Sequence, residues 1–117
     1  MKIAVVGSRN INLTTEELKD YIPKNAGTLI SGGARGIDSA VALFSKEAGI
    51  HLIEIKPNYE RYGRGAPIVR NREIVRQAEH VIIIWDGVSR GSKNVIEECV
   101  RQGKDFTQYV INKNEET

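Results

Sequence analysis

Short apolar runs alternate along the chain with stretches in which apolar residues recur every three or four positions. The apolar runs have the length of strands and cover residues 2–6, 28–30, 51–55, 81–85 and 106–111. The stretches between them are polar on one face and predict helices at about 14–23, 36–49, 67–79 and 92–103, with a polar loop at 56–66. The pattern therefore predicts the element order β-α-β-α-β-α-β-α-β.

Several residues indicate where these helices begin and end. Thr14 and Glu17 have the spacing of a capping box, and Pro67 suits the first turn of a helix. Gly49 and Gly103 follow apolar periodic stretches, where a glycine commonly ends a helix. The last two helices are predicted to direct inward Ile68, Ile74, Val75 and Ala78, and Val95, Ile96, Cys99 and Val100.

Strands that are joined through helices run parallel, and their crossovers are right-handed. We therefore expect a three-layer, doubly wound α/β sandwich with a five-stranded, mostly parallel sheet in the order 3-2-1-4-5. Residues 1–111 form its single domain and 112–117 a polar tail. Ligands of such sheets bind at the carboxyl ends of the strands, where the strand order reverses, here between the first and fourth strands.

Three turns rich in glycine, serine and arginine follow apolar runs and fall at this edge. Glycine lets backbone N–H groups approach a ligand, serine donates a hydrogen bond, and arginine supplies positive charge. The candidate ligand-binding residues in these turns are Gly7, Ser8 and Arg9; Ser31, Gly32, Gly33, Ala34, Arg35 and Gly36; and Gly87, Ser89, Arg90, Gly91 and Ser92. Together they predict a pocket for an anion or a nucleotide.

The stretch 31–38 is the strongest single motif, although it fits neither the dinucleotide fingerprint nor the P-loop. A tight strand-to-helix turn would need one or two glycines, whereas this one has three beside a serine and an arginine. Asp38 has two interpretations. It either favours the helix N-terminus electrostatically, or it accepts hydrogen bonds from ribose hydroxyls or fixes Arg35. Backbone amides at 32–36 and 88–91 are expected to cradle phosphate.

Arg70 and Asn71 open the third helix at the same edge, directly after the loop at 59–66. A solvated surface is the usual role of such residues. The alternative is that Arg70 binds a phosphate through two hydrogen bonds, which a lysine could not do. Gly63 and Gly65 would then let the preceding loop act as a lid over the site.

Composition narrows the classes of function only a little. The net charge of +2 over 117 residues is too small to indicate nucleic-acid binding by itself. The single cysteine, Cys99, gives neither an intramolecular disulfide nor a thiolate metal cluster, and no metal is expected. The first strand is predicted to begin at residue 2, so that no signal peptide is expected. No apolar run reaches the length that would span a membrane. These features predict a soluble, cytoplasmic protein.

Taken in order, these motifs make the chain resemble the SLOG superfamily, and within it the small YspA-type branch. This superfamily joins the DNA-processing protein A (Smf) family to the Lonely-guy phosphoribohydrolases. The motifs are 7–9, 31–38, 62–64 with 70–71, and 85–92. The resemblance covers nearly the whole chain and implies a Rossmann-like domain that binds a nucleotide or an ADP-ribose-like ligand, with no certain cofactor. Since relatives pair through helices beside the site, it also implies a homodimer.

The resemblance leaves three functions open. The leading one is binding or sensing of a phosphorylated, nucleotide-derived ligand. The second is hydrolysis of the N-glycosidic bond of nucleoside monophosphates, against which Val95 counts, because it stands where the phosphoribohydrolases carry a glutamate. The third is single-stranded DNA binding, as in DNA-processing protein A, with Tyr59 and Tyr62 to stack on bases among arginines.

Overall fold

A computed structural model describes residues 1–111. All strand pairings are parallel, in the order β3-β2-β1-β4-β5. The strands are β1 (Lys2–Gly7), β2 (Thr28–Ser31), β3 (His51–Glu54), β4 (His80–Trp85) and β5 (Phe106–Val110). The helices are α1 (Thr15–Lys19), α2 (Ile37–Ala48), α3 (Tyr59–Tyr62), α4 (Ala66–Gln77) and α5 (Arg90–Gln102), with a 3₁₀ turn, η1 (Gly63–Gly65). The predicted fold class and strand order are confirmed.

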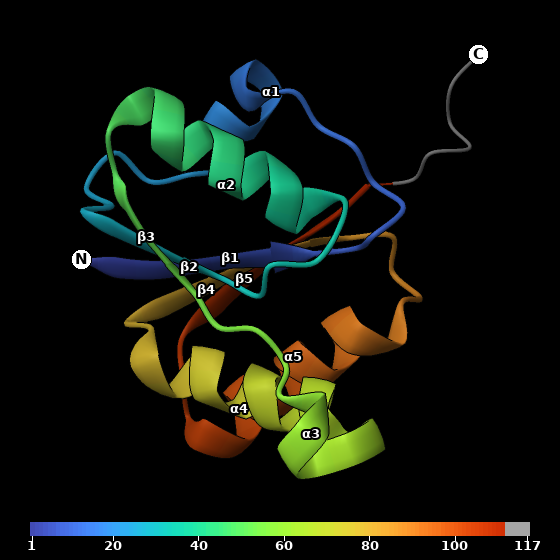
Figure 1. Ribbon diagram of the computed structural model, residues 1–117. Coiled ribbons are helices and arrows are strands. Elements are labelled where there is room, and N and C mark those ends of the chain that lie inside the picture. Colours follow the sequence, from blue (N-terminus) through green and yellow to red (C-terminus); the bar gives the residue numbers. More distant parts are fainter. Residues whose placement is uncertain (112–117) are drawn as a thin grey trace.

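The helices cover both faces of the sheet, with α1 and α2 on one side and α4 and α5 on the other (Figure 1). Successive side chains of a strand point to opposite faces. In β1, Ile3 and Val5 accordingly pack with α1 and α2, whereas Ala4 and Val6 pack with α4 and α5. The apolar runs without polar alternation are therefore strands buried on both faces. Within residues 1–111 no helix is long and apolar enough to cross a membrane.

The predicted helix ends agree with the structure at most positions. Thr14 and Glu17 form the capping box of α1. Pro67 lies in the first turn of α4. Gly49 and Gly103 end α2 and α5 in the left-handed conformation, with φ of 69° and 65°. These signals are local in sequence, which is why they could be recognised without the fold.

Three expectations about the helices were wrong. Ile68 and Val100 were predicted to point inward, but they are 48% and 68% exposed. The buried residues of α5 are Ser92, Val95, Glu98 and Cys99. Val100 lies beside the buried face that they form rather than on it. The polar loop at 56–66 contains α3 and η1, because the Asn58 side chain caps α3 by accepting from the amide of Arg61.

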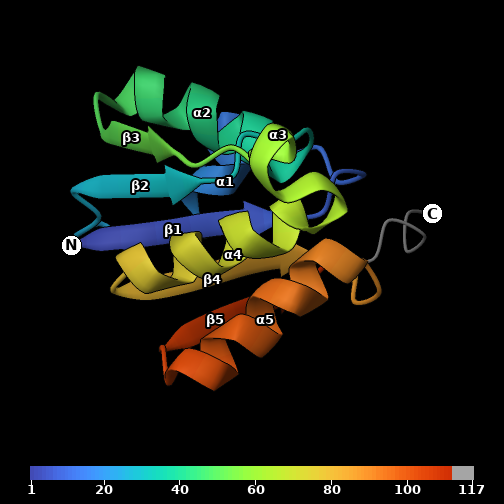
Figure 2. The ribbon, with the colours of Figure 1, turned by 60° about the horizontal axis from the view of Figure 1, so that its bottom comes forward.

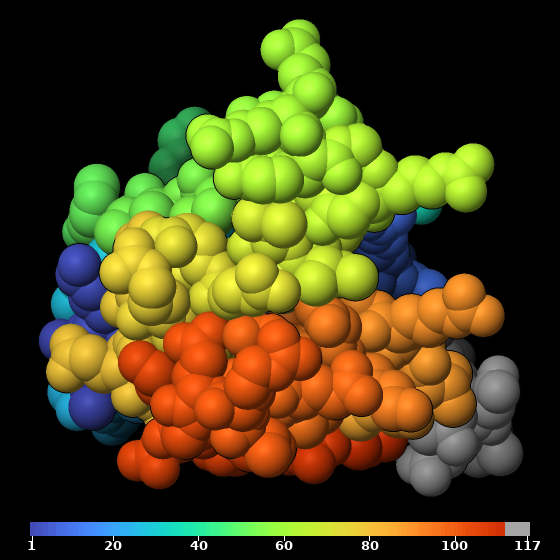
Figure 3. Space-filling view, turned by 90° about the horizontal axis from the view of Figure 1, so that it is seen from below, coloured from blue at the N-terminus to red at the C-terminus, as the bar shows by residue number. Residues whose placement is uncertain are grey.

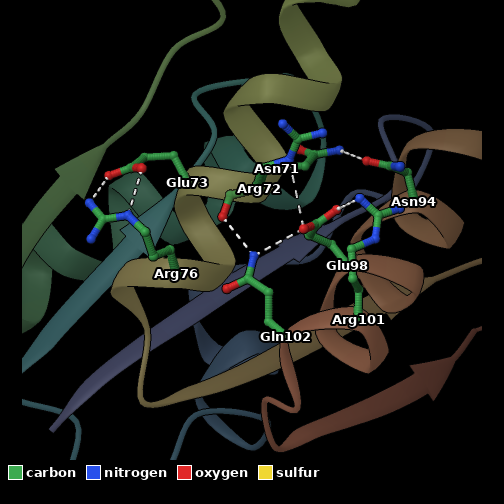
Figure 4. A network of polar contacts seen from close by, with 8 residues as sticks. All are labelled: Asn71, Arg72, Glu73, Arg76, Asn94, Glu98, Arg101 and Gln102. Carbon is green, nitrogen blue, oxygen red and sulfur yellow. Dashed lines mark hydrogen bonds and ion pairs between the residues drawn. The ribbon is translucent and has the colours of Figure 1, made fainter.

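Glu98 is a buried carboxylate between α4 and α5 (Figure 4). Its Oε1 accepts from Gln102 Nε2 at 3.1 Å and lies 3.8 Å from Arg72 Nε, while its Oε2 lies 3.2 Å from Arg101 Nη1. Gln102 also donates to the carbonyl of Arg72, so that it bonds to both helices. This network holds together the two helices whose first turns border the candidate site.

We expect Glu98→Ala to lower the free energy of unfolding by about 1–3 kcal/mol, because it removes a buried acceptor and the partner of two arginines. Both arginines are more than half exposed, so that solvent keeps the cost below that of a fully buried pair. The matched control is Glu97→Ala on the exposed side of α5, with an expected change within about 0.5 kcal/mol. Equal effects in urea unfolding would contradict a stabilising role for Glu98.

Candidate ligand-binding site

The strands point toward one edge of the sheet, where the first turns of α4 and α5 meet the end of β1 (Figure 2). At this edge lies a cavity of about 380 Å³, here called the first cavity. Figure 3 shows the hollow between the α3 region and the start of α5, with the N-terminal segment at its depth. Twelve predicted residues line it: Gly7, Ser8, Arg9, Gly32, Ala34, Asp38, Arg70, Asn71, Ser89, Arg90, Gly91 and Ser92.

A second cavity of about 370 Å³ adjoins the first. The two share the lining residues Arg9, Gly32, Ala34 and Arg70. The second is completed by two further predicted residues, Gly33 and Arg35, and by Ser39 and Pro57, which the sequence reasoning had not singled out. Three predicted residues line neither cavity: Ser31, Gly36 and Gly87.

Gly7 and Gly36 allow the backbone to approach closely behind the site. A Cβ atom on Gly7 would lie 2.0 Å from the carbonyl oxygen of Ile84. A Cβ atom on Gly36, whose φ is +72°, would lie 2.4 Å from the carbonyl oxygen of Ser8. That carbonyl accepts from the amide of Ile37, the first residue of α2. The glycines therefore let β1 end against the start of α2, which is a structural role.

Asp86 engages groups that were predicted to bind phosphate. Its Oδ1 accepts from the amides of Val88 and Ser89 at 2.9 and 2.8 Å and from the Ser89 hydroxyl at 2.6 Å. Since Ser89 gives its proton to Asp86, the 2.6 Å bond between Ser89 Oγ and Ser8 Oγ uses the proton of Ser8. The hydrogen bond from Ser89, followed by those from the amides, lowers the pKa of Asp86 far below its usual range. A ligand therefore meets hydroxyl protons that are already engaged.

Asp38, at the start of α2, resembles Asp86 in that its carboxylate accepts a hydrogen bond from a backbone amide of a predicted phosphate-binding turn. It is 5% exposed, and its Oδ2 accepts from the amide of Ala34 at 3.1 Å. Among residues 1–111, its buried Oδ1 has no hydrogen-bond partner. Among charged side chains, Arg70 rather than Arg35 interacts most strongly with the Asp38 carboxylate. Burial raises the pKa of Asp38, although the Ala34 amide and Arg70 lower it in part.

We expect Asp38→Asn to stabilise the protein at pH 7. Because the folded protein raises the pKa of Asp38 above its ordinary value of 3.8, the contribution of Asp38 to stability is greatest below that value and is lost as the pH rises through the raised pKa. Asparagine keeps an acceptor for the Ala34 amide and never ionises. Its advantage over wild type should therefore grow between pH 3 and 7 in denaturant unfolding. Asp86→Asn should instead lower the free energy of unfolding, since the folded protein favours the ionised form of Asp86. A pH-independent difference for Asp38→Asn would contradict this account.

Arg70 reaches from α4 across the carboxyl edge and is half-buried, whereas a solvated surface position would leave it exposed. Its Nη1 donates to the carbonyl oxygen of Gly32 at 2.7 Å and its Nε donates to Asn71 Oδ1 at 2.8 Å. Asn71 in turn donates to Asn94 Oδ1 on α5 at 3.0 Å. Within residues 1–111 no hydrogen bond engages Nη2 of Arg70. The guanidinium is thus fixed in orientation and retains donors for a ligand.

The sequence reasoning missed an apolar wall and two polar contributors. Val6, Pro67, Ile74 and Val95 line the first cavity together with Asn10 and Asp86. The apolar members could be recognised only as core residues, because the cavity lies where the core opens at the sheet edge. Trp85, at the end of β4, packs in the core, and its Nε1 donates to Gln108 Oε1 at 3.0 Å.

No protein-family model matches the chain, and no curated protein matches it. Its fold is similar to that in the X-ray structure of DNA processing protein A (DprA) from Streptococcus pneumoniae, with a TM-score of 0.77 and 20% sequence identity. The match covers 97% of this chain and 52% of that one, so the chain spans about half the length of that protein. The comparison supports the expected resemblance at the level of the fold; the YspA-type branch stays a prediction.

Proposed function

We propose that this protein binds a phosphorylated, nucleotide-derived ligand at the carboxyl edge of the sheet. The observation that carries the proposal is the guanidinium of Arg70, which two hydrogen bonds hold at the first cavity and whose Nη2 is not engaged by any hydrogen bond within residues 1–111. A half-buried arginine with spare donors is suited to hydrogen-bond a phosphate, and burial strengthens such bonds. The cavity volume lies within the range of small-molecule sites.

Arginine side chains, more than a backbone cradle, supply the attraction for phosphate in this proposal. The amides of Ala34, Val88 and Ser89 are bonded to carboxylates of the protein itself. Arg9 and Arg90 are exposed and line the cavity with Arg70. The carboxylates of Asp38 and Asp86 and the apolar wall line the same cavity and suit the nucleoside part of the ligand.

Binding is favoured over N-glycosidic hydrolysis because of Val95. This residue lines the first cavity at the position where the resemblance implies a glutamate. The nearby Glu97 is exposed, and Glu98 is buried against Arg101 and Gln102, so neither lines the cavity. Incubation with nucleoside monophosphates and chromatography for free base tests the alternative: release above a buffer blank would overturn our preference.

The test of ligand binding is equilibrium titration of the protein with AMP, NAD and ADP-ribose. We expect at least one dissociation constant below about 1 mM, which corresponds to roughly −4 kcal/mol. Mass spectrometry of small molecules that co-purify with the undenatured protein extends the search to other nucleotides. If no nucleotide co-purifies and none in the panel binds, the proposal fails.

A second candidate, single-stranded DNA binding, is favoured by the surface of α3. Tyr59 and Tyr62 are 56% and 41% exposed, and Arg61 lies over the Tyr62 ring at 5.3 Å. Exposed aromatic rings among arginines offer stacking surfaces for bases. This candidate predicts that a labelled oligonucleotide binds at low ionic strength and dissociates steeply with added salt. Tyr62→Ala should weaken it, whereas absence of any shift at low salt would exclude it.

A further inference from the structure

Charged residues divide unequally between the two adjoining cavities. The first is lined by the carboxylates Asp38 and Asp86 as well as by arginines. The second is lined by Arg9, Arg35 and Arg70, and none of the carboxylates in the described part of the chain is among its lining residues. The first cavity thus combines acceptors with positive charge, whereas the second presents positive charge alone to whatever occupies it.

Groups around the second cavity do not fully neutralise the positive charge of its arginines. Lys56 and Glu54 both pack near Gly33, at 3.2 and 3.8 Å from the position that a Cβ atom would occupy there. Their opposite charges largely offset one another. The Asp38 carboxylate offsets part of the charge of Arg70. The net positive charge that remains at this cavity comes from its three arginines, and a group with two or more negative charges would be attracted there.

The position of the shared arginines limits what the ligand can be. Arg9 and Arg70 line both cavities, while Arg35 lines the second alone. A phosphate at the boundary would contact Arg9 and Arg70, and a second phosphate bonded to it would lie toward Arg35. Two adjacent phosphates suit this arrangement because both remain in reach of the same two arginines.

We propose that the ligand belongs to the nucleoside diphosphate class, with its nucleoside in the first cavity and its second phosphate in the second cavity beside Arg35. This inference rests on the proposed function and specifies its ligand. Arg35 is then a specificity-determining residue, which recognises the second phosphate and has no contact with the first. A strand of nucleic acid could also supply a second phosphate, although it would be a full nucleotide further away.

The experiment compares the 5′-mono- and 5′-diphosphates of adenosine, guanosine, cytidine and uridine by titration calorimetry. For the base that binds best, we expect the diphosphate to bind at least tenfold tighter than the monophosphate. Arg35→Ala should remove this difference and leave the monophosphate affinity within twofold of wild type. The matched control is Arg90→Ala, because Arg90 lines only the first cavity. It should change the ratio of the two affinities by less than twofold.

Each contrary outcome has a separate meaning. Equal affinities of mono- and diphosphates, or a loss of monophosphate binding in Arg35→Ala, would overturn the diphosphate inference and leave the proposed function intact. If no nucleotide of either class binds, the diphosphate inference fails, and the proposed function fails with it only if NAD and ADP-ribose do not bind either and no nucleotide co-purifies. A 5′-phosphorylated dinucleotide that binds tighter than every diphosphate, in an Arg35-dependent manner, would overturn the inference in favour of a nucleic-acid strand.

Discussion

Gly36→Ala should lower the free energy of unfolding by about 3–5 kcal/mol, which would be the largest stability effect among these substitutions. Gly36 has φ +72° and ψ −123°, a conformation that L side chains rarely adopt. An added Cβ atom would lie 2.4 Å from the carbonyl oxygen of Ser8 and 2.6 Å from that of Arg9. Both neighbours are backbone atoms, so that no side chain can move aside.

The substitution Gly36→Ala should also disturb the contact between the end of β1 and the start of α2, which lies behind the candidate site. The Ser8 carbonyl accepts from the Ile37 amide, and this bond fixes the start of α2 against the end of β1. Gly65→Ala is the matched control, since φ there is −79° and no atom of residues 1–111 lies within 4 Å of the added atom. It should be neutral or stabilising by up to about 1 kcal/mol. Urea unfolding curves with the same midpoint for both variants would contradict the close approach at Gly36.

Arg70→Ala should weaken nucleotide binding by about 1.5–3 kcal/mol, or roughly 10- to 150-fold. The loss follows from removing a guanidinium held by Gly32 and Asn71 at the wall of both cavities. Arg70→Lys should lose most of this affinity too, because an ammonium group cannot form both internal bonds and still face the ligand. Titration with the nucleotide that binds the wild type best measures both effects.

Stability should also fall in Arg70→Ala, by about 1–3 kcal/mol. A solvated surface position, one of the two roles that the sequence left open for Arg70, would make its loss of little importance for stability. In the structure it is half-buried, and its loss leaves the Gly32 carbonyl without this donor. Arg76→Ala is the control on the same helix, where the exposed Arg76 pairs with Glu73. It should leave affinity unchanged; wild-type affinity in Arg70→Ala would instead place Arg70 outside the site.

The fold was predictable because its signals are local and periodic. Apolar runs marked the strands, and residues such as Thr14 and Gly49 marked helix ends. Parallel topology then brought the three turns to one edge, where most of the candidate residues line one cavity. For this step no knowledge of side-chain positions was needed.

What could not be predicted depends on side-chain direction and on contacts between distant segments. Arg70 bonds to Gly32, 38 residues away, and nothing in the sequence indicates that reach. Asp86 and Asp38 accept from backbone amides in turns that were expected to offer those amides to a ligand. Burial of Glu98 follows from the rotation of α5 about its axis, which its apolar residues alone did not determine.

Nucleotide binding at the carboxyl edge of the sheet is tested most directly by a map of backbone amide chemical shifts, recorded by NMR during nucleotide titration. We expect saturable changes at the residues that line the two cavities, foremost Arg9, Gly32 and Ala34, with little change at the opposite edge near His51 and Phe106. Saturable changes confined to other surfaces, or none at millimolar nucleotide, would contradict binding at the carboxyl edge.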